Sequence, residues 1–384
     1  MKVLLISHTC QSRTEGQPKA VELARLGVDL RVVVPRRWKH YGRLRFPERP
    51  IEGAGFRLLP LSTRLAWCGP AQSYLHFYPG LGRVMREFAP DVIDLWEEPW
   101  SAVSLQACLL RERVCPGAAL VSETEQNIDK TLPPPFEPMR SQVLRRADWV
   151  VGRNTEALDI VRRKGFAGQA RVVPNAVDAD TFRPLSEGER ASVRREAGWR
   201  TDEFVAGYVG RLVEEKGLTD FVEAVALSQL RVRAVLIGEG PFEGVLREQI
   251  ARLGLNGRVQ ILPARSPQKL APLMGALDVL VLPSRTTARW KEQFGRVLIE
   301  AGACGVPVIG SDSGAIPDVV GEGGRVFPEG NARELARHLD ELSAHPDQAR
   351  ALGVAGREAV EERYTWARVA QAMLAIYREL RPDA

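Results

Sequence analysis

Two glutamates in the second half of the chain, Glu292 and Glu300, stand eight positions apart in a stretch that reads Glu-Gln-Phe-Gly-Arg-Val-Leu-Ile-Glu. The Phe-Gly pair and the apolar residues after it predict a helix over residues 296–303. Glu292 then lies in the loop before the helix, and Glu300 lies more than one turn inside it. With a rise of ~1.5 Å per residue, roughly 8–10 Å of helix separates the two. This spacing fits one long polar ligand that is contacted at two places.

The start of this helix is a place where an anion could bind. The first N–H groups of a helix have no partner within it, and the helix dipole makes this end positive. Here these groups belong to Phe294, Gly295 and Arg296. A carboxylate at each end with an anion site between them suits a sugar, a diphosphate and a ribose.

Two cations, Arg211 and Lys216, follow a predicted strand at residues 204–209, in the segment Gly-Arg-Leu-Val-Glu-Glu-Lys-Gly that begins at Gly210. A planar guanidinium can bind two phosphate oxygens, and an ammonium supplies a compact charge. Fixed positive charges lower the barrier when a leaving phosphate gains negative charge. The alternative is an ordinary pair of solvated side chains after a strand.

Taken together, these segments resemble the retaining GT-B glycosyltransferases of family four, the glycosyl transferases group 1 type. Residues 292–300 resemble that family's E-x7-E signature, and Arg211 with Lys216 resembles its Arg-x4-Lys pair. Gly-Glu-Gly-Pro at 238–241 is similar to its G-x-G-P turn, and Pro-Asn-Ala-Val-Asp at 174–178 to its PN-x-VD segment. Motifs this short recur by chance, but here four follow one another in the family's order. They cover about half of the chain, and the first half matches weakly.

The resemblance implies a retaining transfer of a hexose from a UDP- or GDP-linked sugar to a hydroxyl acceptor, in bacterial glycan, polysaccharide or glycolipid synthesis. It implies that Glu300 accepts hydrogen bonds from ribose hydroxyls and that Glu292 holds the donor sugar near the reacting carbon. It also implies that the arginine–lysine pair replaces a metal, so neither a metal nor another cofactor is expected. The implied catalytic residues are Glu292, Arg211 and Lys216. The implied donor-binding residues are Gly16, Gly210, Arg211, Lys216, Glu292, Phe294, Gly295, Arg296 and Glu300.

The first half departs from the family pattern at two places. The family carries Gly-Gly after the first strand, where the backbone approaches the donor phosphate, but this chain has Gly16-Gln17. Gly16 could equally be a plain turn glycine. Many relatives also carry a histidine after the fourth strand, whereas residues 122–127 read Ser-Glu-Thr-Glu-Gln-Asn. Glu123 or Glu125 could face the acceptor instead, or this could be an ordinary surface loop.

A further acidic segment, Glu-Glu-Pro-Trp at residues 97–100, follows the predicted strand at 92–95. Loops at the carboxyl ends of parallel strands carry function in such sheets. A carboxylate beside an aromatic ring is common in sugar sites, so Glu98 is a third candidate on the acceptor side. The alternative is a turn with a partly buried tryptophan.

At 384 residues the chain is long enough for two domains with separate cores. Strand and helix patterns alternate in both halves, which is typical of doubly wound parallel sheets. The expected strands are at 2–7, 30–34, 92–95, 119–121, 149–152, 171–173, 204–209, 234–237, 259–262, 279–282 and 306–309. The main expected helices are at 19–26, 218–227, 242–253, 267–275, 296–303 and 366–380.

We therefore predict an α/β fold of the GT-B kind, in which two Rossmann-like doubly wound domains face a central crevice. The first, acceptor domain covers residues 1–182, and the second, donor domain covers 183–365. As the resemblance implies, the terminal helix at 366–384 packs back on the first domain.

Other patterns limit the cellular context. No apolar run reaches the eighteen residues that a membrane helix needs, and the first strand is too short for a signal-peptide core. The five cysteines include no C-x-x-C pair, which favours reduced thiols in the cytoplasm over disulfides or zinc. Asp178-Ala179-Asp180 spells the D-x-D metal signature of another glycosyltransferase fold, but it lies in the linker-like segment and we interpret it as a chance match.

Basic and aromatic residues alternate over residues 36–46, with Trp38 and Tyr41 among them and Trp67 nearby. Residues 1–64 hold 13 Lys and Arg against 5 Asp and Glu. Three interpretations remain open: peripheral contact with the inner face of the cell membrane, a solvated basic face, and nucleic-acid binding. No nucleic-acid module accompanies the segment, so we expect no nucleic-acid partner. Membrane contact would suggest a lipid-linked acceptor.

Two other classes of function fit the same motifs. A sugar phosphorylase or a nucleotide-sugar epimerase could share the fold, and so could a nucleotide-sugar sensor without catalytic activity. Dependence on free phosphate or product formation without an acceptor would identify the first class. Slow hydrolysis of the donor would exclude the sensor.

Overall fold

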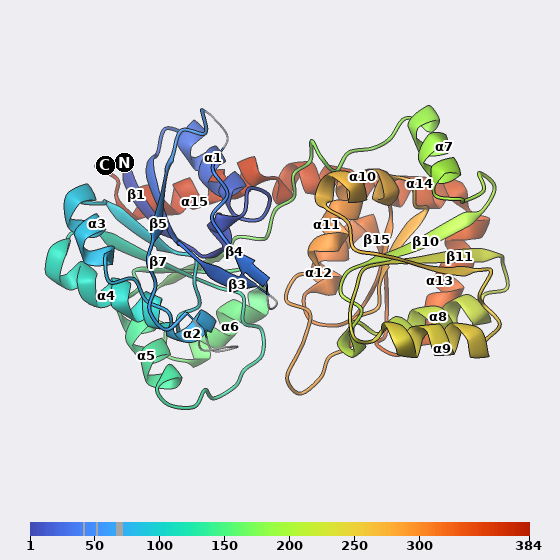
Figure 1. Cartoon of the computed structure of the whole chain (residues 1–384), viewed down its shortest axis with the longest axis horizontal. Helices are drawn as coiled ribbons and strands as arrows, with labels where there is room; N and C mark the ends of the chain where they lie inside the picture. Colours follow the sequence, from blue (N-terminus) through green and yellow to red (C-terminus); the bar gives the residue numbers. More distant parts are fainter. Residues whose placement is uncertain (41–42, 51–52, 67–71) are drawn as a thin grey trace. The chain divides into compact units, whose positions relative to one another are not determined.

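The computed structural model describes residues 1–40, 43–50, 53–66 and 72–384, and the chain forms two compact units (Figure 1). The first unit consists of Met1–Pro174 with Trp366–Ala384, and the second of Asn175–Thr365. Each unit is an α/β structure around one parallel sheet with its own hydrophobic core. No helix within the described ranges is long and apolar enough to cross a bilayer.

The sheet of the first unit has seven parallel strands in the order β5-β2-β1-β6-β7-β8-β9. The chain starts in the middle with β1, builds outward to β5, and then returns to build the other half, so the winding reverses between β1 and β6. The strands are β1 Lys2–Ile6, β2 Asp29–Pro35, β5 Arg57–Leu61, β6 Val92–Leu95, β7 Ala119–Thr124, β8 Trp149–Gly152 and β9 Gln169–Val172. A separate antiparallel ribbon is formed by β3 Trp38–His40 and β4 Arg43–Arg45.

Helices cover both faces of this sheet, with α1 and α15 on one side and α3, α4 and α5 on the other (Figure 1). Successive residues of a strand point to opposite faces of the sheet, so β1 can pack against helices on both sides. Leu4 and Ile6 of β1 point to one face and cluster there with Met85 of α3 and Val103 of α4. The residues between them point to the other face. The helices are α1 Gln17–Arg25, α2 Gln72–Leu75, α3 Leu81–Phe88, α4 Ala102–Val114, α5 Phe136–Arg146, α6 Thr155–Arg163 and α15 Trp366–Leu380.

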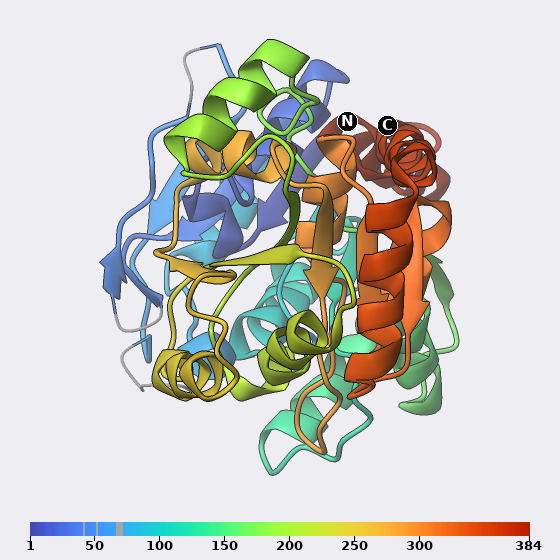
Figure 2. The same ribbon diagram turned by 90° about the vertical axis from the view of Figure 1, so that its right-hand side faces the viewer.

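The second unit has six parallel strands in the order β12-β11-β10-β13-β14-β15, again with a reversal of winding beside its first strand. Helices lie on both sides of this sheet (Figure 2). The strands are β10 Phe204–Val209, β11 Val232–Ile237, β12 Val259–Leu262, β13 Val279–Leu282, β14 Val308–Ser311 and β15 Gly324–Phe327. The helices are α7 Glu187–Glu196, α8 Leu218–Leu227, α9 Glu243–Arg252, α10 Pro267–Gly275, α11 Arg296–Ala303, α12 Ile316–Val320, α13 Ala332–Ala344 and α14 Pro346–Ala359.

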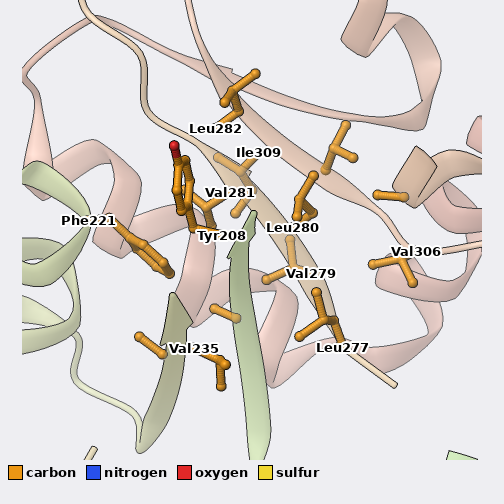
Figure 3. Packing of buried hydrophobic residues seen from close by; sticks show 14 of the residues in the cluster. Tyr208, Phe221, Val235, Leu277, Val279, Leu280, Val281, Leu282, Val306 and Ile309 are labelled. Carbon is orange, nitrogen blue, oxygen red and sulfur yellow. The ribbon is translucent and has the colours of Figure 1, made fainter. Parts of the chain in front are cut away.

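The centre of the second core lies around β10 and β13 (Figure 3). All four residues of β13 are buried, which explains its uninterrupted Val-Leu-Val-Leu sequence. On one side of the sheet, Tyr208 of β10 and Phe221 of α8 belong to the same buried cluster as Val235 of β11. This packing fixes the strand ends from which the loops of the candidate site emerge.

Most expected elements are found, and the two largest differences have physical causes. Nine elements have the bounds predicted from the sequence: the strands at 92–95, 149–152, 204–209, 259–262 and 279–282 and the helices at 218–227, 267–275, 296–303 and 366–380. The strand expected at 306–309 is β14 and begins at Val308, because Pro307 has no N–H to donate to a ladder. The strand expected to end at Val121 continues to Thr124, because the charge of Glu123 is neutralised inside the unit.

The boundary between the units lies at Pro174 rather than at residue 182, where the sequence placed it. Val177 and Phe182 are buried in the second core, and the Val177 N–H donates a hydrogen bond to the Tyr364 carbonyl at 2.8 Å. Residues 175–182 therefore fold with the second unit. Helix α15 packs against α1 and belongs to the first.

A network of buried polar groups joins the first sheet to α1 and α15. The Lys19 ammonium of α1 donates to Asp94 of β6 at 2.9 Å and to Glu123 of β7. Arg153, which follows β8, pairs with the other oxygen of Glu123. The Tyr377 hydroxyl of α15 donates to the same Asp94 oxygen as Lys19, at 2.6 Å. These side chains are at most 3% exposed, so each charge depends on its partners for stability.

Removing the Tyr377 hydroxyl should weaken the attachment of α15. We expect Tyr377→Phe to lower the free energy of unfolding by about 1–3 kcal/mol, because it removes a buried hydrogen bond to a carboxyl group. Urea unfolding followed by tryptophan fluorescence measures the change. Tyr78→Phe is the matched control, because the buried Tyr78 hydroxyl has no partner among the described residues. Equal stability of the two variants would contradict a role for the Tyr377–Asp94 bond.

Candidate active site

The second unit brings together Lys216 and Glu292, which lie 76 positions apart in the sequence. Lys216 ends a short turn after β10, and Glu292 lies in the loop between β13 and α11. The ammonium Nζ is 2.5 Å from Glu292 Oε2, which also accepts a hydrogen bond from the Ser284 hydroxyl at 2.8 Å. Glu292 is 8% exposed, so this pairing is what allows its charge to be buried.

An aromatic residue that the sequence analysis did not select completes this pair. The Lys216 ammonium lies 4.8 Å from the centroid of the Trp290 ring, within the range of a cation–π contact. The ammonium is thus held between a carboxylate and an aromatic face. The position of Trp290, two residues before Glu292, was the only signal for it in the sequence.

Gly217 explains how the two loops come so close. Its φ of 62° lies in the left-handed region, where glycine is favoured. A Cβ at this position would lie 1.9 Å from the Pro283 carbonyl oxygen, which follows β13. A glycine directly after Lys216 therefore permits the loops after β10 and β13 to pack in contact.

Arg211 also follows the carboxyl end of β10, but its side chain is more exposed to solvent than those of Lys216 and Glu292. Its side chain is 47% exposed, and its guanidinium is 3.9 Å from the Glu215 carboxylate. Its backbone carbonyl accepts a hydrogen bond from the buried Tyr208 hydroxyl at 2.8 Å, which fixes the chain after β10. A Cβ at Gly210 would lie 2.6 Å from that hydroxyl oxygen, so this position also requires glycine.

Helix α11 begins as the sequence predicts, with Gly295 at its N-cap in the left-handed region. The Phe294 side chain is 4% exposed, and its ring packs edge-on against Tyr364. Phe294 therefore belongs to the core, and it can serve a ligand through its backbone N–H alone. The N–H groups of Gly295 and Arg296 lie in the first turn, where an anion is favoured.

Glu300 is a partly buried carboxylate in the middle of α11. Its side-chain carboxylate makes no hydrogen bond or ion pair with any other residue that the structure describes. Burial raises the pKa of Glu300 above its ordinary value, and the Arg296 charge acts in the opposite direction. Since a carboxylate in such a place is costly, hydroxyl groups of a ligand would stabilise it.

The first unit has a pocket of about 220 Å³ at the carboxyl ends of its central strands. It contains all three carboxylates that the sequence selected for the acceptor side. The lining residues are His8, Thr9, Tyr74, Trp96, Glu97, Glu98, Glu123, Thr124 and Glu125.

The three predicted carboxylates differ in what holds them. Both oxygens of Glu123 are taken by cations, so the expectation that Glu123 faces an acceptor is not supported by its contacts. Glu98 accepts hydrogen bonds from the Thr124 hydroxyl at 2.7 Å and from the Glu125 N–H at 2.9 Å. Burial raises the pKa of Glu98 to about 7. Glu125 is 3.4 Å from the Arg153 guanidinium.

Sequence analysis missed His8 and Glu97, which form a pair in this pocket. The His8 Nδ1 lies 2.8 and 2.9 Å from the two Glu97 oxygens, and the His8 backbone N–H donates to the same carboxylate at 2.6 Å. Burial lowers the pKa of His8, but the Glu97 charge outweighs this and raises it above the ordinary value. Only the position of His8 after the first strand could have indicated it.

The structure decides the position of two aromatic residues for which the sequence left alternatives open. Trp100 is 5% exposed, so it packs in the core and Tyr74 lines the pocket in its place. Trp38 is 4% exposed and stacks on His8 with ring centroids 4.7 Å apart, so it is not part of an exposed basic surface. The predictions that involve Tyr41 and Trp67 lie outside the described residues.

Gly16 and the Asp178 segment both have structural explanations. Gly16 caps α1, and a Cβ there would lie 2.6 Å from the backbone of Thr9 and Cys10. Close packing of the chain therefore requires this glycine whether or not a phosphate binds beside it. The Asp178 carboxylate accepts hydrogen bonds from the Asp180 N–H at 3.1 Å and from the Thr181 hydroxyl at 2.6 Å, which identifies it as a turn cap.

Residues 189–359 match the model of the family described as Glycosyl transferases group 1. The D-inositol 3-phosphate glycosyltransferase of Segniliparus rotundus is 35% identical over 217 residues, which are 54% of this chain and 46% of that protein. The alpha-maltose-1-phosphate synthase of Mycolicibacterium smegmatis is 32% identical over 229 residues, 55% of this chain and 57% of that protein. The chain spans about half the length of the curated relatives it matches. These matches confirm the family resemblance that the motifs predicted.

Solved structures are similar over the whole chain. The sucrose-phosphate synthase of Thermosynechococcus elongatus has a TM-score of 0.78 at 22% identity and covers 100% of both chains. The HepE protein of Anabaena, crystallised with UDP, has a TM-score of 0.74 at 19% identity over 99% of this chain and 100% of that one. At such identities the likeness concerns the fold, and it confirms the predicted GT-B type with two Rossmann-like domains.

The raised pKa of Glu98 predicts a pH-dependent stability. A carboxyl whose pKa rises from 4.5 to about 7 on folding stabilises the folded chain while it is protonated, and this contribution is lost as the pH rises through 7. Between about pH 5 and pH 8, wild type should therefore lose about 1–3 kcal/mol relative to Glu98→Gln. Thermal unfolding over this range measures the difference.

The control for this experiment is Glu87→Gln. Glu87 is exposed, and Arg83 lowers its pKa, so its titration ends below the tested range. A constant difference between wild type and Glu98→Gln across the range would show that Glu98 does not titrate there.

Proposed function

We propose that this chain, in which residues 189–359 match the glycosyl transferases group 1 model, is a retaining glycosyltransferase that moves a hexose from a UDP- or GDP-linked sugar to a hydroxyl acceptor. One observation carries the proposal. Within that family's domain, Lys216 and Glu292 meet at 2.5 Å beside the carboxyl ends of the neighbouring parallel strands β10 and β13. In doubly wound sheets this edge, at the reversal of winding, is where ligands bind.

The ion pair suggests how the donor engages the two residues. A diphosphate brings more negative charge than one carboxylate, so Lys216 exchanges Glu292 for phosphate oxygens when the donor binds. The exchange frees the Glu292 carboxylate to accept hydrogen bonds from the sugar hydroxyls. Arg211, which is half exposed, adds a bidentate contact to the diphosphate, and Glu300 accepts hydrogen bonds from the ribose.

The transfer step follows from these contacts. The bond between the anomeric carbon and the diphosphate oxygen breaks, and the electron pair stays on that oxygen, where Arg211 and Lys216 stabilise it. The acceptor oxygen bonds to the same face of the anomeric carbon, and its proton passes to the leaving diphosphate. The configuration is thereby retained, and the reaction needs no separate protein base.

Structures of one similar protein support the proposed donor class. Crystals of Anabaena HepE contain UDP, and other crystals of that protein contain UDP-glucose. We propose a nucleotide-sugar donor on this basis. We also propose that no metal or other cofactor takes part, because Arg211 and Lys216 would supply the positive charge that a diphosphate needs. We further propose a cytoplasmic enzyme of bacterial glycan, polysaccharide or glycolipid synthesis.

The phosphate pair provides the direct test of this function. Arg211→Ala and Lys216→Ala should each weaken nucleotide diphosphate binding and raise the transition-state barrier by about 2–4 kcal/mol, because each removes a charge from the leaving group. Titration with UDP and GDP and the slow hydrolysis of UDP-glucose, both in EDTA, measure these effects. Arg247→Ala is the control, because Arg247 is an exposed residue of α9 paired with Glu243. Wild-type binding in both variants, or activity that requires added manganese or magnesium, would overturn the mechanism.

Substitutions of Glu292 and Glu300 should affect different steps, nucleotide binding in one case and turnover in the other. Glu300→Gln should weaken binding of the bare nucleotide, because the proposed contact is the ribose. Glu292→Gln should leave nucleotide binding nearly intact and lower the rate of turnover, because the proposed contact is the transferred sugar. Calorimetric titration with UDP and steady-state rates with the donor distinguish these outcomes. An equal loss of nucleotide affinity in both variants would contradict the assigned roles.

We also propose peripheral contact with an anionic membrane through the basic segment at residues 36–46. Arg36, Arg37 and Lys39 are exposed, and so are two large apolar side chains beside them, Leu44 at 47% and Phe46 at 60%. Exposed cations next to exposed apolar groups suit the surface of a bilayer with anionic lipids. Membrane contact would place a lipid-linked acceptor within reach of the enzyme.

Vesicle sedimentation tests this contact. The protein should bind anionic phosphatidylglycerol vesicles more tightly than neutral phosphatidylcholine vesicles, and added salt should weaken the binding by screening. The triple variant Arg36→Ala, Arg37→Ala, Lys39→Ala should lose about 3 kcal/mol of this binding, at ~1 kcal/mol per cation. The triple variant of the exposed Arg83, Arg86 and Arg113 loses the same charge elsewhere in the unit and serves as the control. Equal loss in both triple variants would refute a localised surface.

A further inference from the structure

The pocket of the first unit is acidic after all its ion pairs are counted. Its lining includes four glutamates and one histidine. Glu97 is paired with His8. The buried cations Lys19 and Arg153 both pair with Glu123, and Lys19 also pairs with Asp94 behind the pocket, so two cations are balanced by two carboxylates.

The other two carboxylates of the pocket have weaker compensation. Glu98 accepts hydrogen bonds from neutral groups, the Thr124 hydroxyl and the Glu125 N–H. Glu125 is 3.4 Å from Arg153, whose charge is already shared with Glu123. A ligand therefore meets surplus carboxylate oxygen at Glu98 and Glu125.

The pocket also offers a fixed imidazole edge. The His8 ring is held at Nδ1 by Glu97 and on its face by Trp38, with ring centroids 4.7 Å apart and planes at 28°. The other ring nitrogen, Nε2, has no hydrogen bond to any residue in the described part of the chain. Since His8 lines the pocket, Nε2 is the ring atom left for a ligand hydroxyl.

Aromatic surface completes the lining. Tyr74 is 38% exposed, and Phe136 packs against its ring with centroids 5.6 Å apart. The buried Trp96 also lines the pocket, and Lys19 is 4.8 Å from its ring centroid. A partly exposed, supported aromatic ring can pack on the C–H face of a sugar, while carboxylates accept hydrogen bonds from its hydroxyls.

We propose that this pocket binds the acceptor and that the part of the acceptor that enters it is an uncharged polyhydroxyl ring without a phosphate group. This inference rests on the proposed function and names the substrate class for it. Glu98 and Glu125 accept hydrogen bonds from acceptor hydroxyls, and His8 Nε2 contacts a further hydroxyl. A phosphate would face the Glu125 carboxylate and, above about pH 7, the ionised Glu98 carboxylate as well, and like charges repel.

The proposal makes a specific contrast. Inositol 3-phosphate, the substrate in the name of the Segniliparus relative, carries a phosphate on its ring. The pocket described here should reject such a ligand and accept its neutral counterpart. For the same reason, we expect the pocket to bind glucose more tightly than glucose 6-phosphate.

The test compares matched neutral and phosphorylated probes on the full chain. Saturation-transfer NMR at pH 8, where Glu98 is ionised, measures binding of myo-inositol against inositol 3-phosphate and of methyl glucoside against glucose 6-phosphate, with UDP present. We expect each neutral probe to bind at least about ten-fold more tightly than its phosphorylated partner. Equal or tighter binding of the phosphorylated probes, or no binding of either neutral probe, would overturn the proposal.

Charge removal shows whether the named carboxylates cause the preference. The double variant Glu98→Gln, Glu125→Gln keeps the side-chain shapes and should reduce the preference for neutral probes to roughly three-fold or less. Glu87→Gln, Glu112→Gln removes the same charge from exposed positions of the first unit and should leave the preference unchanged. An unchanged preference in the first double variant would contradict the assignment. The single variant Glu98→Gln should show an intermediate preference, and it serves if the double variant unfolds.

The same samples separate this inference from the proposed function. UDP binding and slow hydrolysis of UDP-glucose depend on the second unit and require no acceptor. If both are present and the phosphorylated probes are preferred, the acceptor class is wrong and the transferase proposal stands. If both are absent and GDP does not bind either, the proposed function itself fails.

Discussion

The carboxylate of Glu123 is the group on which the first unit depends most. It lies inside the central strand β7, where an uncompensated charge would prevent folding, and its two oxygens are bound by Lys19 of α1 and Arg153 after β8. Lys19 in turn reaches Asp94, which also holds the Tyr377 hydroxyl of the terminal helix. Neutralising one charge thus fixes elements from both ends of the chain. Burial and the neighbouring Glu123 charge raise the pKa of Asp94, while the two cations lower that of Glu123 against the effect of its own burial.

The two units place their pairs of opposite charge in equivalent positions. In each sheet the first strand lies beside the fourth, where the winding reverses. In the first unit His8 follows β1 and Glu97 follows β6, and the two are in contact. In the second unit Lys216 follows β10 and Glu292 follows β13, and these are also in contact. The topology brings these loops together, so each unit gains a carboxylate with a basic partner at the sheet edge suited to ligands.

The units differ in the charge that remains at those edges, and this difference fits two kinds of ligand. The second unit adds the half-exposed Arg211 and the positive start of α11, which favour a diphosphate. The first unit adds Glu98 and Glu125, which disfavour one. Similar topologies can therefore suit a charged donor in one unit and an uncharged acceptor in the other, because the loop residues determine the electrostatic potential at each sheet edge.

The sequence by itself determined the secondary structure around the second site and the identity of its charged residues. Helix α11 and the strands β10 and β13 have their predicted bounds, because their apolar residues are continuous or follow helical spacing and glycines mark their ends. The motifs also selected Lys216 and Glu292 as residues of one site. Their direct ion pair could not be predicted, because a spacing of 76 residues carries no distance and the contact depends on the loops packing at Gly217.

In the first unit, the sequence selected three of the pocket's carboxylates, but only the tertiary structure decided which other residues join them and what each carboxylate is paired with. His8 and Glu97 belong to no motif, and they meet because β1 and β6 are neighbours in the sheet. In the sequence, Glu123 and Glu98 are both glutamates at or just after a predicted strand. In the structure, Glu123 is bound by two cations, whereas Glu98 is bound by neutral groups. Local patterns reveal which residues can be charged or buried. What a charge pairs with is set by residues distant in the chain, and for this protein that pairing decides which carboxylates stabilise the fold and which remain for a ligand.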